Sequence, residues 1–195
     1  MKIFSLLAGL LLIGSMLRAQ EISVLPKDET GKYIYYEVVS TTNGINEDSL
    51  KLRAVNFINT NKKEIKLKSS KVETELTGSG KIVITKSLAM LSHPSGEITY
   101  TFNFEVNAQK YRFWLSNFEF IPYQKDRYGN FVPSTTVGIA LETEPKKSNA
   151  EQWEDYRLQA SKYAANFAKR FKDHLVGKLV TTKPSPEKKV ISKTW

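Results

Sequence analysis

The 195-residue chain contains no cysteine and only two histidines, so it is poor in the residues that most often carry nucleophilic or metal chemistry. The lack of cysteine excludes a disulfide, a thiolate metal site, a cysteine nucleophile and an N-terminal lipoprotein anchor. Hydrophobic residues make up 41% and charged residues 25%, which is ordinary for a globular protein. One folded domain without a cofactor is therefore expected.

Long apolar runs are also absent, except at the start of the chain. Residues 3–17 form an almost unbroken apolar run between Lys2 and Arg18. This run is shorter than the roughly 20 residues that a helix needs to cross a bilayer. It has the charge and length of a cleavable export signal. We therefore expect a signal peptide at 1–19, a mature chain that starts near Gln20, no stable membrane anchor after cleavage, and a periplasmic or secreted protein.

The formal net charge of +9 is unevenly distributed. Residues 178–195 hold five lysines against Glu187 and look like a basic, disordered tail. After the signal and the tail are removed, residues 20–177 carry an excess of about three positive charges. A nucleic-acid reader concentrates its positive charge on its folded surface. The charge pattern therefore predicts a single domain at 20–177 that does not bind nucleic acid.

A strand followed by a short helix opens the mature chain. Residues 32–40 are rich in aromatic and β-branched side chains, which favour strands. Asn46 can cap a helix that ends near Asn59. Its apolar residues recur at helical spacing and should be buried: Leu50, Ala54, Phe57 and Ile58.

Antiparallel strands are expected next. Residues 64–76 and 81–85 read as a hairpin joined by a turn at Thr77–Gly80, and His93–Gly96 reads as a second turn because of its proline and glycine. Paired glutamates occur at Glu73 and Glu75, and at Glu142 and Glu144. These pairs read as solvated strand faces rather than as catalytic carboxylates.

The clearest strand spans residues 98–106, where apolar and polar residues alternate without error. The next strand, 111–120, changes phase at Ser116–Asn117, which indicates a bulge. Residues 122–133 read as an aromatic connection, and residues 137–141 as one further short strand.

A long amphipathic helix ends the domain. Ser148 with Glu151, or Asn149 with Gln152, could form a capping box at its start, and Gly177 marks its end. One apolar stripe follows its length: Trp153, Tyr156, Ala160, Tyr163, Phe167, Phe171 and Leu175. The helix is long enough to cover a whole sheet.

This order predicts a two-layer α+β fold: a curved antiparallel sheet of about five to six strands, with a short helix after the first strand and a long C-terminal helix packed on it. Leu25–Asp28 leading into Gly31–Tyr35, the helix start at 46–50 and the strand at 98–104 resemble the "domain of unknown function 4468" family. This resemblance implies a fold like that of the TATA-binding protein and an exported bacterial protein. It implies no activity, because the family has none that could be carried over.

Aromatic side chains beside cations are the strongest candidates for a functional surface. Trp114 should lie on the opposite face of its strand from Tyr111 and Phe113, and the 122–133 connection adds three rings and two cations. Such residues are enriched at binding hot spots and at sugar-stacking sites. The candidate ligand- or partner-binding residues are Trp114, Tyr123, Lys125, Arg127, Tyr128 and Phe131.

Three functions remain open at this level. The favoured hypothesis is a non-enzymatic domain that binds an envelope protein or an extracellular ligand. The second is an enzyme, or an enzyme accessory subunit, that acts on an envelope polymer. The third is association with a membrane surface through the lysines of residues 178–195. His93 and His174 have no partner recognisable in the sequence, so we expect neither a metal site nor a catalytic histidine.

Overall fold

A computed structural model of the chain describes residues 25–41, 45–72, 75–88, 91–107 and 110–177. The expected signal peptide and basic tail lie outside these residues. No helix in the described ranges is both long enough and apolar enough to cross a membrane.

An antiparallel sheet dominates the structure, with long strands in the order β1-β5-β4-β3-β2. Two short strands, β6 and β7, pair with β5 beyond the reach of β1. The elements in chain order are β1 Ile34–Ser40, α2 Glu47–Thr60, β2 Ile65–Val72, β3 Glu75–Leu88, β4 Leu91–Asn107, β5 Lys110–Lys125, β6 Phe131–Pro133, β7 Ile139–Ala140 and α3 Ala150–Val176. The expected strand, short helix, strands, long helix order is confirmed.

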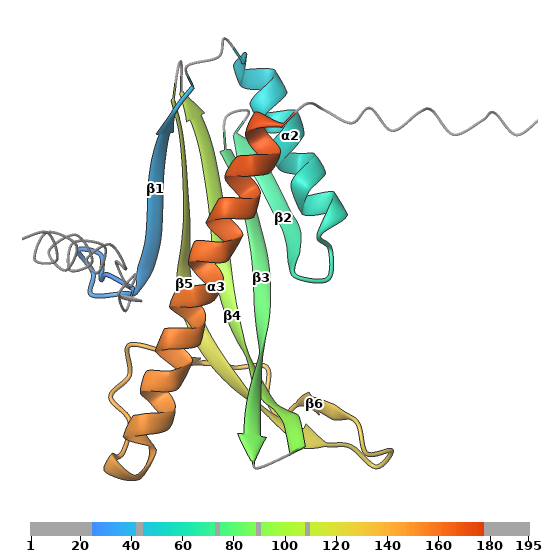
Figure 1. Ribbon diagram of the computed structural model, residues 1–195, viewed down its shortest axis with the longest axis vertical. Coiled ribbons are helices and arrows are strands. Elements are labelled where there is room, and N and C mark those ends of the chain that lie inside the picture. Colours follow the sequence, from blue (N-terminus) through green and yellow to red (C-terminus); the bar gives the residue numbers. More distant parts are fainter. Residues whose placement is uncertain (1–24, 42–44, 73–74, 89–90, 108–109, 178–195) are drawn as a thin grey trace, which may run out of the picture.

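Both helices lie on the same face of the sheet, and α3 runs along most of its length (Figure 1). Side chains from the inner faces of β4 and β5 meet the apolar stripe of α3 in a core rich in aromatic rings. Phe171 is its centre, because its ring lies 5.1–5.5 Å from those of four neighbours: Phe57, Phe102, Phe104 and Phe113. The expected two-layer α+β architecture is confirmed.

Helix α2 begins as the sequence predicts. The side chain of Asn46 accepts a hydrogen bond of 2.8 Å from the Ser49 amide, and its four expected core residues are buried. Helix α3 differs at its start. A single 3₁₀ turn, Lys147–Asn149, precedes it, and Asn149 makes no side-chain cap, so the expected capping box is wrong. The expected apolar stripe and the end near Gly177 are confirmed.

The expected turn at Thr77–Gly80 is wrong, because these residues lie inside β3. Their glycines allow close packing instead of a reversal. A Cβ on Gly78 would lie 3.1 Å from the Lys66 carbonyl oxygen, and one on Gly80 would overlap the Tyr100 ring. Glycine within a strand often marks such a close approach.

The expected turn at His93–Gly96 is also wrong. These residues belong to β4, whose pairing with β3 shifts there: Ile84 faces Gly96 and Thr85 faces Pro94, which leaves Ser95 as the extra residue of a bulge. Proline is tolerated at a bulge because the ladder is already interrupted.

The phase shift in β5 is a bulge, as predicted. Thr99 faces Glu119 and Thr101 faces Ser116, so two residues of β5 oppose Tyr100 alone. Asn117 takes the left-handed conformation there, with φ of 53°. The short strand expected at 137–141 is reduced to Ile139–Ala140.

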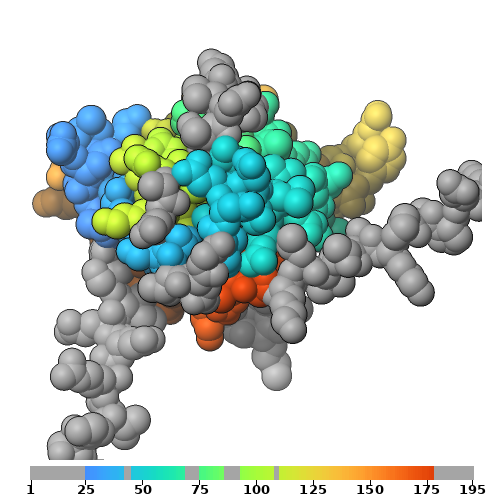
Figure 2. All heavy atoms as spheres, turned by 90° about the horizontal axis from the view of Figure 1, so that it is seen from above, coloured from blue at the N-terminus to red at the C-terminus, as the bar shows by residue number. Residues whose placement is uncertain are grey.

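Residues 122–133 form a β-hairpin of β5 and β6, so the expected loop connection is wrong. Asp126 holds its turn, because its carboxylate accepts hydrogen bonds of 2.8 Å from the Tyr128 and Asn130 amides. Gly129 supplies the required positive φ of 81°. The hairpin, yellow in Figure 2, projects from the side of the molecule.

Candidate binding surface

The face of the sheet opposite α2 and α3 carries mostly polar side chains. Since strand side chains alternate between faces, the residues between the buried ones point outward. On β4 these outward residues are Thr99, Thr101, Asn103 and Glu105, next to buried Tyr100, Phe102 and Phe104. No described helix covers this outer face (Figure 1).

An aromatic patch of Tyr36, Val38, Arg112 and Trp114 lies at the β1 and β5 end of the outer face. Tyr36 is directly opposite Trp114, and Val38 is opposite Arg112. The ring centroids of Tyr36 and Trp114 are 6.3 Å apart. Tyr36 is 47% exposed and Val38 is 53% exposed, so both present apolar area on this face.

Arg112 stabilises the aromatic patch from one side. Its guanidinium lies 5.6 Å from the Trp114 ring and 2.5 Å from the Glu105 carboxylate. Hydrogen bonds to Glu105 and then to Tyr36 raise the pKa of Arg112, so the cation is held between a carboxylate and two rings. A hollow of about 290 Å³ opens beside these residues.

The sequence identified Trp114 in this patch but missed Tyr36, Val38 and Arg112. The signal was present in the alternation of β1. Tyr35 and Val39 pack against the core, so the alternate residues Tyr36 and Val38 had to face outward. Pairing of β1 with β5, which brings Tyr36 to Trp114, could not be read from either strand alone.

Tyr123 lies near the other end of β5 in a different environment. Its hydroxyl donates a hydrogen bond of 2.7 Å to Glu97, which also forms an ion pair of 2.8 Å with Lys81. Burial and the hydrogen bond to Glu97 raise the pKa of Tyr123, so the phenol stays protonated and remains a donor. This cluster ties β3, β4 and β5 together.

The other four candidates lie on the β5–β6 hairpin. Lys125 lies 5.3 Å from the Phe131 ring, and Arg127 lies 5.0 Å from the Tyr128 ring. His93 stacks on Phe131 at 5.8 Å between ring centroids. The hairpin is thus a second aromatic surface, with Tyr128 74% exposed.

The candidates therefore fall on two surfaces. Trp114 and Tyr123 are nine positions apart on β5, about 30 Å along an extended strand. The hairpin residues lie close together, whereas Trp114 joins residues from β1.

The described residues contain few groups of side chains that could carry out catalysis. No group of three potential metal ligands occurs in them. The half-buried His174 packs edge-on against the core residue Phe57. Glu142 accepts a hydrogen bond from the Tyr33 amide in the turn after β7, so the expected shared strand face with Glu144 is wrong. Glu73 lies outside the described residues, so its pairing with Glu75 remains a prediction.

The open antiparallel sheet with a long C-terminal helix defines a TBP-like fold. Two solved structures share it: a TBP-like protein from Parabacteroides distasonis, with a TM-score of 0.56, and a DUF4468 family protein from Bacteroides ovatus, with a TM-score of 0.54. The first is 11% identical, over 78% of this chain and 97% of its own. The second is 13% identical, over 83% of this chain and 95% of its own.

The family model described as a domain of unknown function (DUF4468) with TBP-like fold matches residues 35–121. The resemblance to this family is thereby confirmed, over the strands that carry the aromatic patch. No curated protein matches the chain.

Proposed function

We propose that this chain is an exported, non-enzymatic binding domain that holds a carbohydrate chain of the cell envelope or the extracellular space on its outer sheet face. The observation that carries the proposal is the pairing of Tyr36 with Trp114 on an open, largely polar face. Aromatic rings offer rigid, flat apolar area at low entropic cost, and the C–H faces of sugar rings stack on such area.

Neighbouring polar side chains support the same ligand class. Thr77 on β3 and Asn103 on β4 lie in one row with Trp114, and the Thr77 hydroxyl lies 3.2 Å from the Asn103 side-chain oxygen. Hydroxyl and amide groups both donate and accept hydrogen bonds, which suits sugar hydroxyls.

Two aspartates, Asp28 and Asp126, are unsuited to act as a catalytic acid. The Thr30 hydroxyl lowers the pKa of Asp28, and the Asn130 amide lowers that of Asp126. Both aspartates therefore stay ionised in turns. A catalytic acid near neutral pH needs a raised pKa instead.

The test is binding of the mature chain to an array of bacterial and plant oligosaccharides, followed by calorimetry on the best ligand. Trp114→Ala should weaken binding by about 2 kcal/mol, roughly thirtyfold, as for a hot-spot ring. Tyr128→Ala removes an exposed ring from the hairpin and should leave affinity unchanged. Loss of binding with Tyr128→Ala alone would assign the ligand to the hairpin, and failure to bind any carbohydrate would refute the proposal.

A further inference from the structure

A second hollow, of about 360 Å³, lies at the opposite edge of the sheet, around β2. Five lysines line it: Lys62, Lys63, Lys66, Lys68 and Lys81. Its volume is in the range of small-molecule sites. We call it the lysine pocket.

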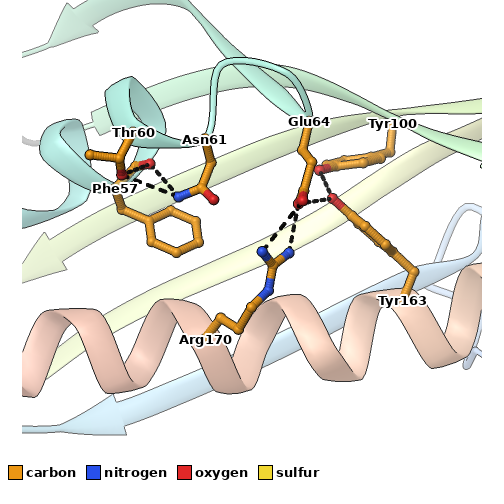
Figure 3. A network of polar contacts seen from close by, with 7 residues as sticks. All are labelled: Phe57, Thr60, Asn61, Glu64, Tyr100, Tyr163 and Arg170. Carbon is orange, nitrogen blue, oxygen red and sulfur yellow. Dashed lines mark hydrogen bonds and ion pairs between the residues drawn. The ribbon is translucent and has the colours of Figure 1, made fainter.

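The positive charge of this pocket is poorly compensated. Glu64 lines it too, but its carboxylate binds Arg170 at 2.6 Å and accepts a hydrogen bond of 3.2 Å from Tyr163 (Figure 3). Lys81 pairs with Glu97. Among the described residues, no carboxylate lies within ion-pair distance of the remaining four lysines: Lys62, Lys63, Lys66 and Lys68.

Hydrogen bonds hold the turn that brings Lys62 and Lys63 to the pocket. The Asn61 side chain donates to the Phe57 carbonyl at 2.8 Å, and the Lys81 amide donates to the Glu64 carbonyl at 2.9 Å. Figure 3 shows Asn61 and Glu64 fixed at the two ends of this turn. The backbone beneath the lysines is therefore organised before any ligand arrives, which lowers the cost of binding.

Hydroxyl groups complete the pocket. Ser79 is the register partner of Lys66, and Thr99 is the partner of Lys81, so these two lysines each have a hydroxyl-bearing neighbour on the same face. The cations are all ammonium groups, which act as compact point charges and bind phosphate or carboxylate without the planar match that arginine requires.

The pocket and the aromatic patch share one face. Register partners form rows that run across the strands on this face. One row passes through Lys66, Ser79, Thr101 and Ser116, and the neighbouring row passes through Asn103, Trp114 and Tyr36. Four strand spacings separate the two edges, about 19 Å. One extended ligand can therefore contact both.

We propose that the lysine pocket binds the acidic group, phosphate or carboxylate, of a polysaccharide whose neutral rings stack on Tyr36 and Trp114. This inference rests on the proposed function and names the ligand as an acidic carbohydrate. A nucleic acid fits less well, because it needs positive charge along its whole path. Here the outward residues of β3 and β4 on the path between pocket and patch are uncharged: Thr77, Ser79, Thr101 and Asn103.

The first test compares hexagalacturonic acid with neutral maltohexaose on the mature chain. The double variant Lys66→Gln/Lys68→Gln should weaken binding of the acid at least about tenfold, since each ammonium removed is a charged hydrogen-bond donor. The matched control, Lys162→Gln/Lys169→Gln, removes two exposed lysines of α3 and should change affinity less than about twofold. Equal effects of the two variants would overturn the pocket.

The second test uses inorganic pyrophosphate, so that the pocket is examined without the patch. Amide NMR shifts should concentrate at Lys66, Ser79 and Lys81, and the pocket variant should abolish them. Absent or scattered shifts would overturn the anion site.

Together the tests separate the two proposals. If Trp114→Ala abolishes hexasaccharide binding while pyrophosphate does not bind, the proposed function stands and the pocket fails. If pyrophosphate binds in the pocket but Trp114→Ala leaves the affinity for the hexasaccharide unchanged, the pocket stands as an anion site and the proposed stacking of sugars on Trp114 is refuted. Tighter binding of a 15-residue oligothymidylate than of hexagalacturonic acid would overturn the carbohydrate assignment.

Discussion

Gly80 on β3 lies directly beneath the ring of Tyr100 on β4, and a Cβ on Gly80 would be 2.2 Å from Tyr100 Cζ. The same ring sends its hydroxyl to within 2.8 Å of the Tyr163 hydroxyl on α3. The missing side chain at Gly80 thus makes room for the ring that joins the sheet to the long helix.

Gly80→Ala should therefore destabilise the domain by about 1–3 kcal/mol, because the Tyr100 ring must move out of a packed core. Urea unfolding followed by circular dichroism measures the loss. The neighbouring change Ser79→Ala points outward and should stay within about 0.5 kcal/mol of the parent. Similar stabilities for the two variants would show that Tyr100 is not confined.

Alkaline pH should unfold the protein through its buried tyrosines. Burial above all raises the pKa of Tyr163 to about 12 and that of Tyr111 to about 12, against about 10 in an unfolded chain. The unfolded state therefore releases these protons first, so stability is full below pH 10 and falls between about pH 10 and 12.

The slope of the free energy of unfolding against pH shows which tyrosines are responsible for this loss. Each such tyrosine contributes up to about 1.4 kcal/mol per pH unit, so Tyr163→Phe should flatten the fall in the free energy of unfolding over pH 10–12. Tyr128→Phe, at an exposed ring, should leave the slope as it is. Parallel slopes for the parent and Tyr163→Phe would contradict the assignment.

The N-cap hydrogen bond of α2 should stabilise the folded domain by about 1 kcal/mol, as for other asparagine caps. Asn46→Ala removes the acceptor for the Ser49 amide and should lower stability by that amount. Asn46→Asp keeps an acceptor and should retain most of it. A loss from Asn46→Asp as large as that from Asn46→Ala would mean that the side-chain oxygen does not matter.

Export should remove the first residues of the chain. The intact mass of protein recovered from outside the cytoplasm should correspond to a start near Gln20. A charge placed in the apolar run, as in Leu11→Arg, should block export and leave the full-length chain inside the cell. Recovery of the uncut chain in the membrane fraction of the parent would refute a cleavable signal.

Local sequence patterns were enough to predict the strands and helices whose own side chains determine their structure. Three patterns indicated directly which side chains are buried. They are the alternation of residues 98–106, the phase shift at Ser116–Asn117 and the apolar stripe of α3. Glycine and proline were misread, because their meaning depends on neighbours. Gly78 and Gly80 permit close packing, and Pro94 sits beside a bulge, yet in the sequence both resemble turns.

The candidate surfaces show the same limit. Trp114 was found because its strand placed it outward, but its partner Tyr36 comes from a strand 78 residues earlier in the chain. The lysine pocket was missed for a related reason. Lys62, Lys66 and Lys68 look like solvated charges in isolation, and only the pairing of β2 with β3 and the capture of Glu64 by Arg170 leave them together without a counter-charge.

The bulge at Asn117 divides β5 into two parts with different partners. Before it, β1 and β4 hold Trp114 in register, and after it β7 and β6 take the place of β1. Insertions or deletions in the β5–β6 hairpin therefore need not shift the register of the aromatic patch. Over evolution the hairpin can diversify in length and sequence while the face that carries Trp114 and Tyr36 keeps its shape.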